Sequence, residues 1–289
     1  MEGNGLKDSE ENLFTAWDDN MEISQLPVQL QQDFSDYVTV DGLISESERF
    51  QCLPGEIYES GIRAISVLGS LKTCIDSIDC IDCIDKLHEV IEIVESLHDN
   101  NSVSDRMIMF ISWLHFRHEF TSVIGWAIPT ANMITTVVGW FNTWMLHHPT
   151  ARFIDMGAGS GAISLLLSSA GLPSDRIIAI DNNTFTYARN FFNVIQPPPY
   201  TYSECFARGI FTPEDVLFIA WGYGLSTCVD QFIESGIQCV IIEGEAEGGA
   251  THPSANHMQE YDDWTTITVH VTPSCGMRHD YLTYNVKNR

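Results

Sequence analysis

The sequence predicts an α/β protein built on a mostly parallel seven-stranded sheet whose last strand runs antiparallel. Three observations lead to this prediction. From residue 151 onward, short runs of β-branched and aromatic residues alternate with helix-length stretches, the pattern of strand–helix–strand units. The first of these runs leads into three glycines at alternate positions. The last two runs have no helix-length stretch between them, so they should pair as antiparallel neighbours.

The residues that precede the sheet fall into two regions. Residues 1–55 are acidic and polar with no sustained period, and we expect a partly mobile segment. In residues 56–124 apolar residues recur every three or four positions, which predicts a helical region packed beside the sheet and covering part of the ligand site. The third region, residues 125–289, begins with a helix that Pro129 opens, because proline suits a first helical turn, and then carries the sheet.

The expected elements of the third region follow one another in chain order. Strands are expected at residues 151–156, 176–181, 200–206, 216–221, 238–244, 265–271 and 280–286. Helices should begin at Ala162, Thr184 and Ser226, with a further helix near Asn256, so that each connects two strands of the sheet.

The charge of the chain limits its partners. The sequence has 14 Lys and Arg against 39 Asp and Glu, a formal net charge of -25. Non-specific nucleic-acid binding depends on cationic side chains, so this balance argues against a broad grip on phosphates, although a local basic groove stays open. A small molecule or a protein is the favoured partner. The helical N-terminal region offers a surface for a partner protein.

Composition also indicates where the protein works and what it lacks. The acidic start does not fit a secretory signal or a transit peptide, and no apolar run reaches the roughly 20 residues that a membrane-spanning helix needs. We expect a cytoplasmic protein that does not bind a membrane. The eight cysteines lack paired spacing, and Cys80 and Cys83 have no second pair after them, so we expect reduced thiols and no metal site.

The motif FIDMGAGSG, residues 153 to 161, gives the sharpest indication of a ligand. An apolar strand ends at Asp155, and Gly157, Gly159 and Gly161 then let the backbone turn tightly and let a ligand lie against it. As a bare pattern the motif also satisfies the dinucleotide fingerprint, which leaves NAD as an alternative. S-adenosylmethionine is favoured for three reasons. An acid stands two residues before the first glycine, the unit begins mid-chain, and the chain ends in an antiparallel pair.

Two later strand ends offer further ligand contacts. The second strand ends at Asp181, whose carboxylate can accept hydrogen bonds from two ribose hydroxyls, with Asn182 beside it. The strand at 216–221 ends in Trp221, and Tyr223 follows. Because ligands of open α/β sheets sit beyond the carboxyl ends of strands, these aromatic side chains can cover an adenine or form the wall of a second pocket.

Four segments together resemble a mostly uncharacterised group of Rossmann-like (class I) S-adenosylmethionine-dependent methyltransferases. They are GWAIPT, FIDMGAGSG, FIAWGYG, and IIEGEAEGGAT taken with GMRHDYLTYNV, and the resemblance covers roughly residues 115–289. That group has a W-A-I-P segment, a strand ending in S-W-P and a G-E-x-x-G-G turn. The resemblance implies a methyltransferase domain in which Trp126, Ile128 and Pro129 border the cofactor. The chain departs from it at Gly222 and Tyr223, where the group usually has prolines.

Methyl transfer is an in-line displacement in which the enzyme aligns the acceptor and, where needed, removes a proton. We expect Tyr223, Glu245 and His252, which follow the strands at 216–221 and 238–244, to act on the acceptor. Two alternatives remain open. One is an NAD-dependent oxidoreductase, whose sheet would be parallel throughout, and the other is a non-catalytic interaction protein that has kept the methyltransferase fold.

Overall fold

The computed structural model of the chain describes residues 63, 66–71, 81–98, 120–121, 123–182, 185, 187, 190–222, 224–245, 251, 253–271 and 280–288. The helices labelled in them are α5 (Ile81–His98), α7 (Ala131–Met145), α8 (Ala162–Ser169), α9 (Tyr202–Ala207) and α10 (Ser226–Glu234), with the short 3₁₀ helices η2 (Ser174–Arg176) and η3 (His257–Glu260). The strands are β1 (Phe153–Met156), β2 (Ile177–Ile180), β3 (Val194–Ile195), β4 (Val216–Ala220), β5 (Cys239–Glu245), β6 (Trp264–Val271) and β7 (Asp280–Lys287).

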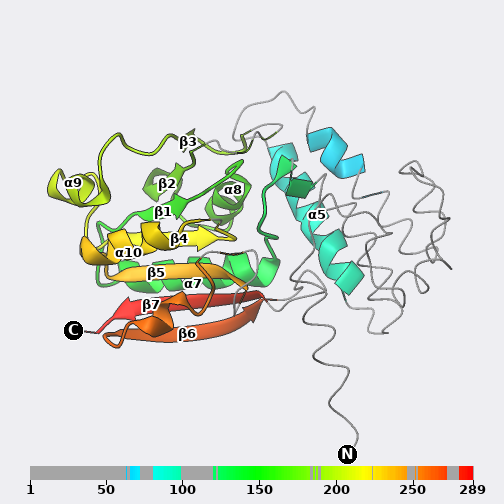
Figure 1. Cartoon of the computed structure of the whole chain (residues 1–289). Helices are drawn as coiled ribbons and strands as arrows, with labels where there is room; N and C mark the ends of the chain where they lie inside the picture. The colour runs from blue at the N-terminus through cyan, green and yellow to red at the C-terminus, as the bar shows by residue number, and fades with distance from the viewer. Residues whose placement is uncertain are drawn as a thin grey trace, which may run out of the picture.

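The strands form one sheet in the order β3-β2-β1-β4-β5-β7-β6 (Figure 1). The pairs from β3 to β5 are all parallel, whereas β7 lies antiparallel to both β5 and β6. This confirms the predicted mostly parallel sheet with an antiparallel last strand. The final hairpin enters the sheet with β7 inward, so β6 becomes an edge strand.

Side chains alternate between the two faces of the sheet along each strand, so both faces carry apolar side chains. Helices cover both of these faces. Phe153 of β1 packs in the apolar cluster that α5, α7 and α8 cover, and the neighbouring Ile154 packs in the cluster that contains residues of α9 and α10 (Figure 1). Strands buried on both faces read as apolar runs, as β1, β4 and β5 do. Asp155 is the exception in β1, and its position places it on the α8 side.

The described part of the N-terminal region is helical. Helix α5 packs against α8, and Glu95 of α5 accepts a hydrogen bond from the backbone N–H of Ala131 at the start of α7 (2.9 Å). Residues 66–71 are helical as well. Residues 1–55 and most of residues 99–122 of the predicted helical region lie outside the described residues, which also do not decide the predicted boundaries at 55 and 124.

Four predicted elements were wrong. Residues 200–206 are not a strand but the turn into α9. There Thr201 accepts a hydrogen bond from the N–H of Glu204, whose carboxylate accepts from the N–H of Thr201, a reciprocal cap that begins a helix. The seventh strand is the short β3. Near Asn256 the chain forms only the 3₁₀ helix η3. Pro129 precedes the N-cap Thr130 instead of occupying the first turn of α7.

The fourth error concerns the segment after β2. The described residues between β2 and β3 contain no helix, although one was predicted from Thr184. Instead this segment packs over the glycine loop. Phe191 is fully buried and donates its N–H to the carbonyl of Ser160 (2.7 Å). The hydrogen bond from Phe191 to the glycine loop has replaced the helical hydrogen bonds that the local sequence favours.

Candidate functional site

The loop between β1 and α8 has the shape that its three glycines predict. Gly157, Gly159 and Gly161 have φ of 78°, 58° and 75°, in the left-handed region that favours glycine. Gly161 is also the N-cap of α8, and an added Cβ there would lie 2.8 Å from the Cβ of Phe192. The loop is held to the next strand, because the N–H groups of Gly157 and Ala158 both donate to the carbonyl of Ile180.

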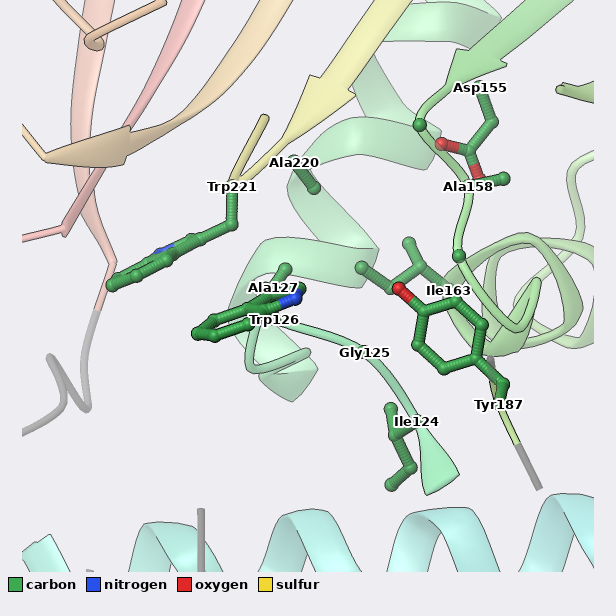
Figure 2. A pocket seen from close by; sticks show the side chains of 12 residues that line it. Ile124, Gly125, Trp126, Ala127, Asp155, Ala158, Ile163, Tyr187, Ala220 and Trp221 are labelled. Carbon is green, nitrogen blue, oxygen red and sulfur yellow. The ribbon is translucent and has the colours of Figure 1, made fainter. Parts of the chain in front are cut away.

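A pocket lies beyond the carboxyl ends of β1 and β4 (Figure 2). Five of the residues predicted for the cofactor line it together: Trp126, Asp155, Gly157, Gly159 and Trp221. They come from the segment before α7, the end of β1, the glycine loop and the end of β4. Segments far apart in the sequence therefore meet where a ligand of an open α/β sheet is expected.

Asp155 is the acidic group of this pocket. It is buried, and the hydroxyl of Ser164 on α8 donates to its Oδ2 (2.6 Å). The pKa of Asp155 is raised from 3.8 to about 7 as the net result of three effects: burial, the largest, raises it, the hydrogen bond from Ser164 lowers it, and the nearby charge of Asp181 raises it. Within the described residues no Lys or Arg pairs with Asp155, so the site favours a cationic ligand group.

Asp181 stands just beyond the end of β2. Its Oδ2 accepts a hydrogen bond from the N–H of Gly159 (2.9 Å), so the second acid is tied to the glycine loop. Neither Asp181 nor Asn182 lines the described pocket, and Asn182 is exposed. Gly161 and Pro129 are buried and also lie outside the pocket lining. These four predicted contacts stay predictions.

The end of β4 carries a strained backbone. Trp221 has φ of 47°, the left-handed region that non-glycine residues rarely adopt, and it is buried against the pocket. Its N–H donates to the carbonyl of Glu243 (2.9 Å), which holds the turn. An added Cβ at Gly222 would lie 2.6 Å from Cγ2 of Ile219. The departure from proline at this position therefore has a steric reason, because proline carries a Cβ.

The residues predicted to act on the acceptor are not assembled by the described structure. Tyr223 and His252 lie outside the described residues. Glu245 is buried at the end of β5, where its Oε2 accepts from the N–H of Thr251 (3.4 Å) and its own N–H donates to Oγ1 of Thr251 (3.0 Å). Glu245 does not line the described pocket, and these two bonds tie it to Thr251.

The sequence analysis missed two residues of the site. Tyr187 lines the pocket, and its ring lies against Gly159. It was placed within a predicted helix, and only the aromatic residues clustered after Asp181 could have drawn attention to it. Ser164 was missed because a serine inside a helix carries no signal of a partner nine residues earlier.

Two other kinds of feature are absent from the described residues. These residues contain no helix that is long and apolar enough to cross a membrane. They also contain no cluster of three or more His, Cys, Asp or Glu side chains arranged to hold a metal ion.

No protein-family model and no curated protein matches the chain. Among solved structures it resembles the O-methyltransferase TomG from Streptomyces achromogenes in complex with SAM, with 15% identity and a TM-score of 0.38, over 56% of this chain and 82% of that chain. It also resembles cofactor-bound Rv0187 from MTB, with 11% identity and a TM-score of 0.42, over 69% of this chain and 98% of that chain. Likenesses at this level carry no argument about activity. The order and directions of the strands are those of the Rossmann-like methyltransferase fold that the sequence predicts.

Proposed function

We propose that the protein is an S-adenosylmethionine-dependent methyltransferase whose acceptor is a small molecule or a protein. The observation that carries this proposal is one pocket that joins the glycine loop, a buried carboxyl at the end of β1 and the aromatic end of β4. The antiparallel β7 inside the sheet argues against the oxidoreductase alternative, because a dinucleotide-binding dehydrogenase sheet is parallel throughout.

The residues of the pocket fit this cofactor chemically. The left-handed glycines let a ligand approach the backbone of the loop closely. Asp155 offers a carboxylate to the ammonium of the amino-acid part, and Asp181 is the proposed acceptor for the ribose hydroxyls. Trp126 and Trp221 supply apolar walls for the rest of the molecule.

S-adenosylmethionine, when bound, supplies a methyl group already activated on a sulfonium. The protein then has to align the acceptor and keep water away from the reacting atoms. We assign the exclusion of water to Trp221, whose buried ring is fixed at the end of β4. The acceptor would approach across the ends of β4 and β5. Tyr223, Glu245 and His252 are the proposed groups to orient it or take its proton.

Calorimetry with S-adenosylmethionine, S-adenosylhomocysteine and NADH tests the proposal. Wild-type protein should bind the first two and not NADH. Asp181→Ala should weaken that binding roughly 5-fold to 150-fold, the scale of one or two lost charged hydrogen bonds. Asp175→Ala, which removes an exposed acid from η2, is the matched control and should leave affinity unchanged. Binding of NADH alone would replace the methyltransferase with the oxidoreductase, and unchanged affinity in Asp181→Ala would remove Asp181 from the site.

A further inference from the structure

The side chain of Tyr187 lies directly on the glycine loop. A Cβ placed on Gly159 would be 3.0 Å from the phenol oxygen of Tyr187 and 3.1 Å from its Cζ. Carbon atoms in favourable contact are about 3.5–4.0 Å apart, so no ligand atom fits between the loop and the ring. In Figure 2 the hydroxyl end of Tyr187 points into the pocket, and Trp126 and Trp221 lie across from it. The phenol therefore takes the place that the glycine at position 159 leaves open.

The room that remains in the pocket is small. Its cavity volume is about 40 Å³, enough for a few water molecules, whereas ligand pockets measure roughly 300–1,000 Å³. A nucleoside ligand cannot lie within this pocket unless at least one lining side chain moves. Asp181 is also already engaged, because its Oδ2 accepts the N–H of Gly159.

Tyr187 is better able to leave the pocket than Trp221. Trp221 is 7% exposed and sits on a strand end whose backbone is bonded to β5. Tyr187 is only half-buried and lies between β2 and β3, where none of the described residues is helical. Burial and the negative charge of Asp181 raise the pKa of Tyr187 to about 12, so the phenol stays neutral beside the two acids. A neutral ring can rest there without repelling them.

We propose that Tyr187 is a built-in occupant of the ligand site, which competes with the nucleoside part of the cofactor for the surface of Gly159. This inference rests on the proposed function, since it takes the glycine loop as the cofactor's binding surface. Cofactor affinity is then set partly by the cost of displacing the phenol, and the protein binds weakly unless something draws the ring away.

The test compares the binding of S-adenosylhomocysteine to wild-type protein, Tyr187→Ala, Tyr187→Ser and Tyr187→Phe. Calorimetry gives the affinity, and stopped-flow fluorescence of the tryptophans at the pocket gives the association rate. The two small substitutions should bind on the order of tenfold more tightly and associate faster, because no half-buried ring has to be displaced. Tyr187→Phe keeps the ring and should stay near wild type. Tyr200→Ala, which removes an exposed tyrosine stacked on Arg208, is the matched control.

The outcomes separate this inference from the proposed function. Binding that appears or tightens only in the small substitutions supports both. If all variants bind equally, or if Tyr187→Ala and Tyr187→Ser bind more weakly than wild type, the phenol is no competitor, although the cofactor site stands. If no variant binds S-adenosylhomocysteine, even with the ring removed and the fold intact by thermal unfolding, both proposals fail.

Discussion

Two buried aspartates at opposite ends of the parallel strands have contrasting surroundings. Asp215, at the amino end of β4, is fully buried and accepts hydrogen bonds from the N–H of Thr212 and from Nε, Nη2 and the N–H of Arg152. Asp155, at the carboxyl end of β1, is as deeply buried, but only Ser164 donates to it in the described structure. The first charge is neutralised within the fold, and the second is not.

The difference shows which end of the sheet is structural and which is kept for a ligand. A buried acid that pairs with an arginine holds the starts of two strands together, and no buried charge is left without a partner. A buried acid without a cation costs free energy when ionised, and its raised pKa of about 7 expresses that cost. An isolated acid of this kind in a cleft is a candidate for function.

The largest expected effect concerns the ion pair between Arg152 and Asp215 at the structural end of the sheet. Arg152→Leu should lower the free energy of unfolding by about 3 kcal/mol, because it leaves Asp215 buried without its cation. Denaturant unfolding measures this loss. Arg176→Leu is the control, since Arg176 makes only a 3.5 Å bond to the carbonyl of Ala151 and should cost about 1 kcal/mol or less. Equal losses in the two variants would remove the contrast between paired and unpaired acids.

The second prediction concerns Asp155→Asn and pH. The folded protein holds the Asp155 proton up to about pH 7, whereas the unfolded chain releases it near 3.8. Between these values the folded state binds more protons, so the wild type should lose stability relative to Asp155→Asn as pH rises from about 4 to 7.

Affinity for S-adenosylmethionine should change with pH in the opposite direction. It should rise in the wild type as pH increases through about 7 and ionised Asp155 meets the ammonium, and it should stay flat in Asp155→Asn. Unfolding and calorimetry from pH 5 to 8 measure both trends. Parallel trends in the two proteins would show that Asp155 does not titrate in this range.

The smallest expected effect concerns the hydrogen bond from Ser164 to Asp155. Ser164→Ala removes the hydrogen bond that lowers the pKa of Asp155, so the pH midpoint of cofactor binding should move upward. A hydrogen bond to an ionised carboxylate contributes about 1 kcal/mol more than one to a neutral group, so the shift should be about one pH unit or less. A midpoint that does not move, measured beside Ser169→Ala as a control on the same helix, would separate Ser164 from the charge state of Asp155.

The sequence by itself determined six of the seven strands, the glycine loop and the antiparallel pair at the end. These follow from patterns within short stretches: the apolar run that stops at Asp155, the alternating glycines, and two alternating strands with too little chain between them for a crossover helix. Asp155 and Trp221 could be assigned to one pocket for the same reason, since parallel strands end at a common edge. Trp126 was assigned to it only through the resemblance to the methyltransferase group.

Only the tertiary structure decided the rest. The segment after β2 forms no helix in its described residues because Phe191 and Tyr187 find partners on the glycine loop, and these contacts outweigh local helix propensity. Ser164 reaches Asp155 only because α8 folds back over β1. The raised pKa of Asp155 and the narrow cavity depend on desolvation and close packing by residues far apart in the chain, and no single stretch of sequence contains either.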